Sequence, residues 1–344
     1  MPHPPSDLVR DFERRAPEVR VLVVGDAMLD VYLDGSASRI SPEAPVPVVR
    51  VEGERRALGG AANVAANVKA LGAACALVAC VGRDAEGDAL LEELARAGVE
   101  AGGVERSSDR PTSVKTRVLV RGQQVARYDR ETHDELTPAA AGAVIDALER
   151  TAGPVHAVAI EDYDKGVMTG AVVAAALSFA RARSIPVVVD PKARGFFAYA
   201  GATVFKPNRS ELEAALREPV RASDAGWLAG VLRRLECDAL VITLGEDGMV
   251  FVEAGGDVQE IPTVARSVFD VSGAGDTVTA VLATALGAGF GVREAATLAN
   301  QAAGVQVGKS GVATVSAREI ARAADRGARA ASTAPGEEFP EDNI

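Results

Sequence analysis

The sequence predicts an α/β fold with three layers, in which helices cover both faces of a mostly parallel central sheet. Strand-like and helix-like segments alternate along most of the 344 residues, and this alternation is typical of parallel strands joined by helices. Apolar residues make up 48% of the chain and aromatic residues only 4%, so small and branched aliphatic side chains must fill the core. Two β-rich segments, 32–54 and 112–130, break the alternation and predict a small separate lid sheet.

Short apolar runs rich in β-branched residues predict the buried strands. They lie at 19–25, 76–81, 155–160, 186–190, 202–205 and 239–243. Segments with helical spacing, several opened by a capping residue or closed by glycine, predict the helices. They lie at 59–72, 88–97, 138–151, 170–183, 209–216, 224–235, 275–287, 291–309 and 316–327. Residues 248–262 have the pattern of a hairpin.

The lid segments have patterns of their own. Pro42, Pro45 and Pro47 exclude a helix from the first segment, and the second contains two alternating runs that predict a hairpin. We expect one domain over residues 1–330 with these two lid segments, and a disordered polar tail at 331–344.

Charge and cysteine content exclude several kinds of partner. With 37 basic and 48 acidic residues the net charge is −11, which argues against nucleic acid as a partner. Three cysteines without metal-ligand spacing predict buried free thiols, and we expect the protein to be located in the reducing cytoplasm. We find neither an apolar signal-peptide region nor an apolar run long enough for a membrane span, so we expect no membrane partner.

The segment DVSGAGD (270–276) has the pattern of an anion-binding helix entrance. Gly273, Ala274 and Gly275 are small, and the free N–H groups at the start of a helix attract a phosphate. Asp276 would repel a phosphate as a passive binder, but it suits a base that takes the proton of an attacking hydroxyl. The alternative is a glycine-rich loop with Asp276 as an ordinary first-turn charge.

A second group of polar residues follows the first strand. Asp26 and Asp30 come at its carboxyl end, the edge where open α/β sheets bind ligands, and a carboxylate can accept two sugar hydroxyls. The glycine pair Gly59–Gly60 and the Asn63 amide begin the next helix. A simple turn and an ordinary helix start are the alternative. The segment lacks the G-x-G-x-x-G fingerprint, which disfavours NAD.

Two further segments have polar or glycine residues after strands. Asn208 and Glu211 in KPNRSELE have the spacing of a capping box, or alternatively Glu211 holds a magnesium-bound water near a triphosphate. VITLGEDG offers Thr243, Gly245 and Gly248 to a nucleotide, or is merely a strand leading to a turn.

Two lysines also follow predicted strands. Lys165 in EDYDKG and Lys192 in DPK suggest an anionic ligand in this acidic protein. Solvated lysines are the alternative. The three histidines show neither metal-ligand nor catalytic-triad spacing.

Together these segments resemble the ribokinase-like carbohydrate kinases, the PfkB family, from about residue 19 to 325. GGAANVAANVKALGA (59–73) is similar to the first signature of that family, and DVSGAGDTVTAVLA (270–283) to its second. Two signatures in the right order are more specific than either alone. The resemblance implies a ribokinase-like three-layer α/β/α fold, ATP and Mg²⁺ as cofactors, and a small-molecule sugar or sugar phosphate as the acceptor.

A narrower resemblance is to the kinase part of the ADP-heptose biosynthesis proteins. It comes from VLVVGDAMLDVYLDGSASRISPEAPVPVV, PTSVKTRVLVRGQQVARYD, DYDKG, DPK and KPNRSE. It implies phosphorylation of D-glycero-D-manno-heptose 7-phosphate at O1, which gives the 1,7-bisphosphate. Many relatives carry a nucleotidyltransferase with a His-x-Gly-His motif, which this sequence lacks. We therefore expect separate enzymes for the later steps.

The resemblance assigns roles by position, with Asp276 as the base. The anion hole would be Gly273, Ala274 and Gly275. Sugar hydroxyls would contact Asp30, Gly59, Gly60 and Asn63. The phosphates and the nucleotide would lie beside Asn208, Glu211, Thr243, Gly245, Gly248 and Asn300, with Glu211 holding Mg²⁺ through water.

Two groups of residues remain. Asp270 and Ser272 are the candidates for a monovalent cation such as K⁺, and Ser272 stands where threonine is commoner in the family. The candidates for the 7-phosphate are Lys165 and Lys192, with Arg39 or Arg130 further out. Glu161 precedes DYDKG where the resemblance leads us to expect serine.

These assignments predict in-line phosphoryl transfer with Asp276 as the base. Closure of the lid would exclude water, and its open edges predict a homodimer. Two alternatives stay open: a kinase for another sugar or sugar phosphate, and a catalytically inactive binding module.

Overall fold

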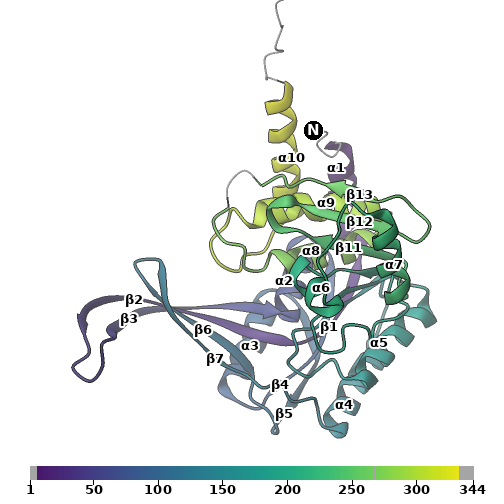
Figure 1. Ribbon diagram of the computed structural model, residues 1–344. Helices are drawn as coiled ribbons and strands as arrows, with labels where there is room; N and C mark the ends of the chain where they lie inside the picture. Colours follow the sequence, from purple (N-terminus) through teal and green to yellow (C-terminus); the bar gives the residue numbers. More distant parts are fainter. Residues whose placement is uncertain (1–5, 266–267, 333–344) are drawn as a thin grey trace, which may run out of the picture.

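A nine-stranded sheet forms the centre of the protein in the computed structural model, which describes residues 6–265 and 268–332 (Figure 1). Its strand order is β13-β12-β11-β10-β9-β8-β1-β4-β5, parallel from β11 to β5 and antiparallel at β12 and β13. The strands are β1 (Arg20–Gly25), β4 (Ala74–Gly82), β5 (Glu100–Ser107), β8 (Ala157–Glu161), β9 (Val187–Asp190), β10 (Val204–Phe205), β11 (Ala239–Thr243), β12 (Met249–Glu253) and β13 (Gln259–Ile261).

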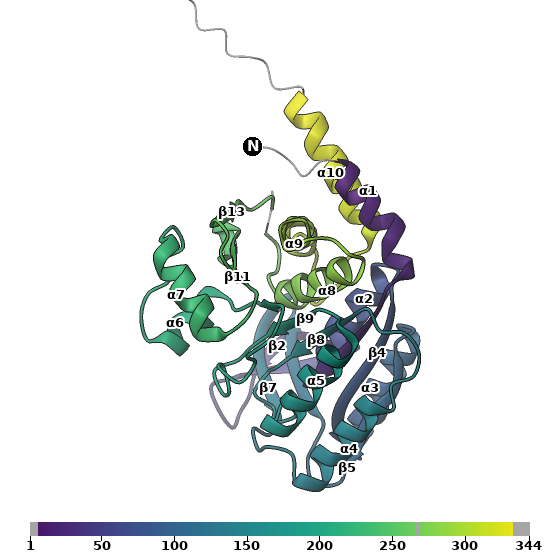
Figure 2. The same cartoon turned by 90° about the vertical axis from the view of Figure 1, so that its right-hand side faces the viewer.

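Helices cover both faces of this sheet (Figure 2). Successive residues of β1 point to opposite faces: Val21 and Val23 pack in one apolar cluster, Leu22 and Val24 in the other. On the Val21 side lie α1 (Ser6–Arg15), α2 (Ala61–Ala70), α3 (Ala85–Arg96), α8 (Ala274–Gly287), α9 (Val292–Gln306) and α10 (Ala317–Ser332). On the Leu22 side lie α4 (Pro138–Glu149), α5 (Gly170–Arg183), α6 (Arg209–Leu216) and α7 (Ala225–Leu235). The three-layer prediction is confirmed.

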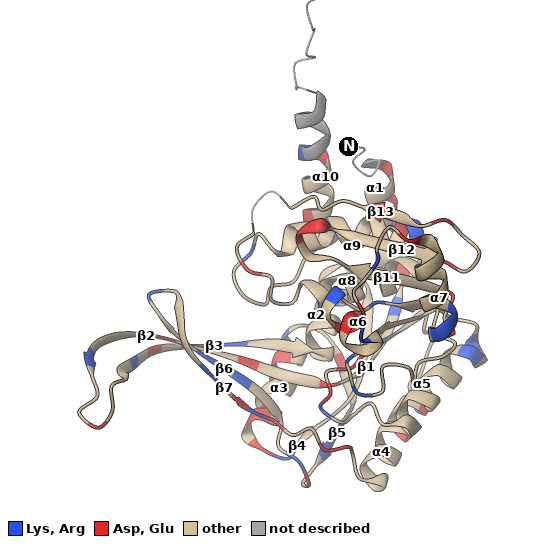
Figure 3. Cartoon of the chain, viewed as in Figure 1, with Lys and Arg blue, Asp and Glu red and all other residues tan. Residues whose placement is uncertain are grey.

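A four-stranded sheet projects from the body as an arm (Figure 1). It has the order β3-β2-β6-β7 and consists of β2 (Ala27–Ile40), β3 (Pro47–Gly60), β6 (Ser113–Val120) and β7 (Gln123–Arg130). Arg121 and Gly122 join the last two strands with φ values of 51° and 79°, as a two-residue hairpin turn with a matching twist requires. Charged residues of both signs line the arm (Figure 3).

The structure corrects the expected element limits in two places. The first lid segment spans residues 27–60 rather than 32–54, because β2 starts directly after Asp26 and its first residues are buried, so they lack an alternating pattern. The edge strand β5 was not predicted, since its polar residues and Gly102–Gly103 hide a strand pattern.

The sequence prediction ended the folded part of the chain too early. Helix α10 continues to Ser332, so it includes the first two residues of the tail that we expected to be disordered. The rest of that tail, 333–344, lies outside the described residues. In the described part of the chain, no helix has the length and apolar character needed to cross a membrane.

Candidate active site

Four neighbouring strands of the parallel sheet place a charged side chain at one edge. The four residues are Asp26 after β1, Glu161 in β8, Asp190 in β9 and Lys206 after β10. The carboxyl ends of parallel strands meet at the same edge, which is the usual ligand edge of an open α/β sheet. All four side chains are buried, so the site begins as a cluster of charges withdrawn from water.

Helix α8 starts against this cluster. Its N-cap, Gly273, has a φ of 79°, and a Cβ there would lie 3.0 Å from Nδ2 of Asn63. The left-handed conformation and the close approach together favour glycine. A Cβ on Gly275 would lie 3.7 Å from Oδ2 of Asp190 and 3.8 Å from Nζ of Lys206. The helix entrance and the strand ends therefore form one site.

One backbone N–H group of the predicted anion hole already has a protein partner. The Ala274 N–H donates to the carbonyl of Val271 at 3.2 Å. A phosphate bound here would therefore use the amides that follow, at Gly275 and beyond, unless this turn opens.

Asp276 lies in the first turn of α8 and is only 3% exposed. Its Oδ2 accepts a hydrogen bond from Nδ2 of Asn63 at 2.6 Å, and its Oδ1 accepts one from the Tyr163 hydroxyl at 2.7 Å. Burial raises the pKa of Asp276 above its ordinary value, although both hydrogen bonds lower it. A buried carboxylate with a raised pKa is a stronger base than an exposed one.

Asp276 is one of three carboxylates that lie close together. Glu161, Asp190 and Asp276 each have an oxygen atom within 4.8 Å of the other two. Lys206, which is 2% exposed, forms an ion pair with Oδ2 of Asp190 at 2.7 Å. Lys206 thus supplies a positive charge to the cluster, while neither oxygen of Glu161 has a hydrogen-bond partner within the described residues.

Asp26 has a structural task at this edge. Its carboxylate accepts hydrogen bonds from the backbone N–H groups of Tyr163, Lys165 and Val167, at 2.8, 3.0 and 3.0 Å. It thereby fixes the loop that contains Tyr163, the residue whose hydroxyl binds Asp276. These three bonds leave Asp26 little acceptor capacity for a sugar.

The predicted sugar residues gather at the root of the lid. Asp30 forms an ion pair with Arg117 of β6, and a Cβ on Gly59 would lie 2.7 Å from Oδ2 of Asp30. Gly60 has a φ of 56°, and a Cβ there would lie 3.4 Å from the ring of Tyr163. The structure therefore brings these residues to the root of the lid, close to Tyr163 and to the Asn63 that binds Asp276.

The two lysines lie in different surroundings. Nζ of Lys192 lies 4.8 Å from the centre of the Tyr163 ring and forms an ion pair with Glu211. Neighbouring carboxylates raise the pKa of Lys192, against the effect of its burial. Lys165 forms an ion pair with Glu131 at 2.8 Å. Lys192 thus lies beside Tyr163, whose hydroxyl binds Asp276, while Lys165 joins the loop to the end of the lid. Of the further candidates, Arg130 pairs with Glu86 and Arg39 is exposed.

The capping-box alternative for Asn208 and Glu211 is present in the structure. The Asn208 side chain accepts from the Glu211 N–H at 2.9 Å, and Glu211 Oε2 accepts from the Asn208 N–H at 2.8 Å. Asn208 also bridges to Thr243 at the end of β11. The geometry therefore gives these residues a structural role, whether or not they also bind a nucleotide.

The other predicted nucleotide residues lie around the turn between β11 and β12. Gly248 has a φ of 89°, and a Cβ there would lie 2.2 Å from the carbonyl of Ile261, whereas Gly245 faces open space. Asn300 donates to the carbonyl of Pro262 at 2.9 Å. Gly248 and Asn300 thus stabilise the turn, and Gly245 leaves room beside it.

The pair proposed for a monovalent cation fastens two loops together. Asp270 accepts from the N–H of Ser272 at 2.9 Å and from the N–H of Gly311 at 3.1 Å. These donors lower the pKa of Asp270, against the opposing effect of burial. Asp270 is therefore fixed close to the helix entrance.

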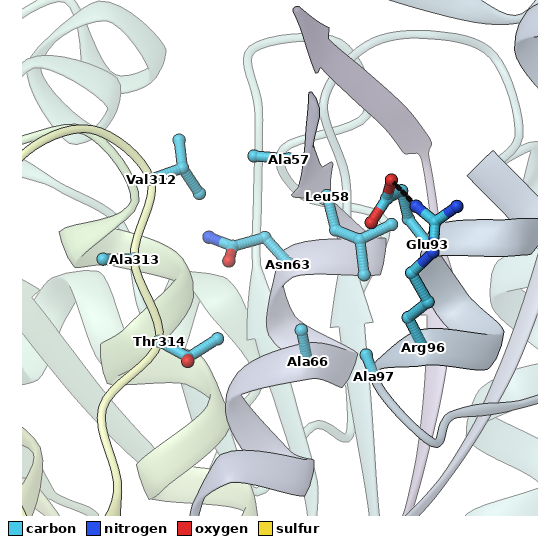
Figure 4. Close-up of a pocket in the computed structure, with 10 residues that line it drawn as sticks. All are labelled: Ala57, Leu58, Asn63, Ala66, Glu93, Arg96, Ala97, Val312, Ala313 and Thr314. Carbon is cyan, nitrogen blue, oxygen red and sulfur yellow. Dashed lines mark hydrogen bonds and ion pairs between the residues drawn. The ribbon is translucent and has the colours of Figure 1, made fainter. Parts of the chain in front are cut away.

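A cavity of about 500 Å³ lies behind Asn63, between β3, α2, α3 and the loop at 312–314 (Figure 4). Alanine and other apolar side chains form most of its wall, and Glu93 and Arg96 form an ion pair at its side. Asn63 thus lies between this cavity and Asp276.

Sequence reasoning missed three residues of the site as individuals, Tyr163, Asp190 and Lys206, and it did not place Glu161 beside Asp190. Each lies in a segment that we quoted, at or just after a strand end, so position at the ligand edge was the available signal. Their mutual contacts depend on strand order, which the sequence does not state.

The fold is that of the ribokinase-like kinases. Phosphofructokinase-2 from Escherichia coli in complex with potassium aligns with a TM-score of 0.74 at 18% identity, covering 90% of this chain and 99% of that chain. Arabidopsis thaliana ribokinase complexed with ribose and ATP aligns with a TM-score of 0.68 at 18% identity, covering 89% and 98%. The model of the pfkB family carbohydrate kinases matches residues 19–319, and the chain belongs to this family.

Curated relatives share more of the sequence. The chain is 48% identical to "Bifunctional protein HldE" of Geobacter sulfurreducens over 91% of its length, and 45% identical to the protein of that name in Pseudomonas paraeruginosa, also over 91%. It spans 64% and 65% of the length of these two relatives, so it corresponds to about two thirds of such a protein.

The hydrogen bond from Tyr163 to Asp276 should set the acidic limb of the pH–rate profile. Without the hydroxyl the pKa of Asp276 rises further, because one of the two donors that oppose its burial is lost. We expect Tyr163→Phe to move the acidic limb of kcat to higher pH. Tyr199→Phe removes a buried hydroxyl that donates to Asp162 instead and should leave the limb in place. Equal shifts in both variants would contradict this role of Tyr163.

Proposed function

We propose that the protein transfers the γ-phosphoryl group of ATP to O1 of D-glycero-D-manno-heptose 7-phosphate. The observation that carries the proposal is the buried Asp276 carboxylate, held by Asn63 and Tyr163 at the entrance of α8. The similarity to the HldE proteins and the motifs of the heptose kinases support this choice of sugar.

The residues around the helix entrance suit a nucleotide triphosphate. When bound, ATP supplies the phosphoryl group and Mg²⁺ neutralises its charge. The start of α8 offers N–H groups and a positive field, and Gly245 leaves open space beside the turn after β11. Both oxygens of Glu211 have protein partners, but a carboxylate accepts about four hydrogen bonds, so Glu211 keeps capacity for a magnesium-bound water.

The acceptor hydroxyl is activated by Asp276. In this mechanism Oδ1 or Oδ2 takes the hydroxyl proton as the oxygen attacks phosphorus. Asn63 and Tyr163 fix the orientation of the carboxylate, which limits the loss of entropy on forming the transition state. Asp30 and the Gly59–Gly60 backbone hold the sugar on the lid side of the base, and closure of the lid excludes water.

The 7-phosphate of the sugar needs a cation. Lys192 fits this role, because its ammonium group lies beside Tyr163 and its raised pKa keeps it charged. Each lysine would have to leave a carboxylate partner, Glu131 for Lys165 and Glu211 for Lys192, so the position of Lys192 beside Tyr163 decides between them. We therefore place the phosphate nearer to Lys192.

Asp276→Asn tests the base. We expect kcat to fall by about 10²–10⁴-fold, because the amide cannot accept the proton, while ATP binding measured by calorimetry stays close to the wild-type affinity. Asp34→Asn, which removes an exposed lid carboxylate paired with Arg55, is the control and should change kcat little. A near-normal kcat in Asp276→Asn would end this assignment.

A substrate panel tests the sugar. ADP release should be fastest with heptose 7-phosphate and slow with ribose or fructose 6-phosphate. The reverse order would favour the rival function, a ribokinase-like kinase for another sugar or sugar phosphate. Absence of turnover with every sugar would favour an inactive binding module.

We also propose a homodimer that forms through the lid. Several large apolar side chains are exposed on the arm, each by 45% or more: Ile40, Val46, Val51, Val125 and Tyr128. A second copy that covers them would remove this apolar surface from water and protect the strand edges.

The double variant Val51→Asp/Tyr128→Asp tests this dimer. Charges on both edge strands should oppose burial of the arm, so sedimentation should show a dimer for the wild type and a monomer for the variant. Phe197→Asp, at an exposed aromatic side chain outside the arm, is the control. A wild-type protein that sediments as a monomer at micromolar concentration would contradict the proposal.

A reducing compartment, the cytoplasm, is the location we propose. Cys75, Cys80 and Cys237 are buried free thiols. Burial raises the pKa of each, which makes them unreactive.

A further inference from the structure

Glu161 is fully buried in the site, and the proposed transfer gives it no task. Its side chain is 0% exposed, and both of its oxygens lack a hydrogen-bond partner among the described residues. An ionised carboxylate in that state would be far more costly than a neutral carboxylic acid. A second atom nearby, Oδ1 of Asp190, also lacks a partner there.

Strand pairing places these two orphaned groups side by side. Glu161 and Asp190 are Cα partners at the ends of the parallel strands β8 and β9, so their side chains point to the same face of the sheet. One proton between them would give both groups a hydrogen bond. No other change in protonation satisfies both groups at once.

The neighbouring groups determine which carboxyl carries the proton. Asp276 accepts from Asn63 and Tyr163, and Oδ2 of Asp190 pairs with Lys206; these donors stabilise the ionised forms. Glu161 has no such donor. The charged and titratable groups that act on Glu161 are Asp190 on β9, Asp276 on α8, Lys206 after β10 and Lys192 after β9, with the Tyr163 hydroxyl bound to Asp276.

We propose that Glu161 is protonated at neutral pH and donates a hydrogen bond to Oδ1 of Asp190. The two side chains then form a carboxyl–carboxylate pair beside Asp276. The neutral Glu161 avoids a third negative charge beside the carboxylates of Asp190 and Asp276 and near the phosphate bound at the helix entrance. It also fixes Asp190, and through it the ammonium group of Lys206 beside Gly275. Glu161 is thus a positioning residue that acts through Asp190.

A divalent cation held by the three carboxylates is the competing explanation of the orphaned oxygens. Lys206 disfavours it, because its ammonium group already bonds to Asp190 and would repel a metal ion at that place. The test below therefore includes a metal ion without nucleotide.

The dependence of stability on pH tests the proposal without any turnover, so its failure is distinguishable from failure of the proposed function. Burial and the adjacent carboxylates raise the pKa of Glu161 well above its ordinary value. Above that ordinary value only the unfolded chain releases the proton, so Glu161 lowers the stability of the wild type as pH rises. Glu161→Gln has no proton to lose, and its amide can donate to Asp190 in the same way.

We expect Glu161→Gln to become more stable relative to the wild type as pH rises between about 5 and 8, by up to about tenfold in the folding equilibrium constant per pH unit. The matched control is Glu131→Gln, because Lys115 and Lys165 lower the pKa of Glu131, against the effect of burial. Its relative stability should instead fall as pH rises through the acidic range. Denaturant unfolding at each pH gives both series, and a pH-independent difference for Glu161→Gln would overturn the proposal.

Infrared spectroscopy and metal addition complete the test. The wild type at neutral pH should show a C=O band of a protonated carboxylic acid that is missing from the spectrum of Glu161→Gln; identical carboxylic-acid bands in the two proteins would refute the shared proton. Mn²⁺ alone should leave the melting temperature of the wild type unchanged. A rise that Glu161→Gln abolishes would establish a cation site in place of the carboxyl pair.

Measurements of kcat distinguish a protonated Glu161 from an ionised one. Glu161→Gln should retain at least about tenfold more kcat than Glu161→Ala, because only glutamine can donate to Asp190 as the protonated acid does. Equal losses in the two variants would mean that the reaction needs an ionised Glu161, contrary to the proposal.

Discussion

The site depends on one constraint: its charged groups are buried away from water at the carboxyl edge of the sheet. Glu161, Asp190, Lys206 and Asp276 are all buried, and burying a charge is costly unless it is paired and hydrogen-bonded. The surrounding structure therefore has to supply donors to the groups that stay ionised, and it does so for Asp276 and for Oδ2 of Asp190. That requirement explains why Asn63, Tyr163 and Lys206 converge on a few carboxylate oxygens.

The Asp276 carboxylate is held by segments that are far apart in the chain. Asn63 comes from the helix after the lid, and Tyr163 from a loop whose backbone N–H groups bind Asp26. Asp276 itself comes from the helix that starts at Gly273. Because each segment is fixed by its own hydrogen bonds, the carboxylate cannot turn freely, and its orientation is set before a substrate arrives.

The lid has a different physical character from the body. Its tip exposes apolar side chains and carries ion pairs between exposed residues, such as Arg50 with Glu52, which contribute little stability. Its root is buried, and a Cβ on Gly60 there would lie 3.4 Å from the ring of Tyr163, whose hydroxyl binds Asp276. A buried root and a lightly stabilised arm suit the lid movement and the sugar contact that we propose.

The sequence by itself determined the layered α/β fold, most element positions and the two glycine-rich signatures. These follow from local patterns: apolar periodicity, capping residues and glycine at crowded turns. Only the tertiary structure decided which strand ends are neighbours. The pairing of β8 with β9 brings Glu161 against Asp190, and the packing of α8 on the sheet brings Asp276 to Tyr163. Such contacts join residues more than a hundred positions apart in the case of Tyr163 and Asp276, and no local propensity encodes them, because they arise from the strand order of the whole sheet.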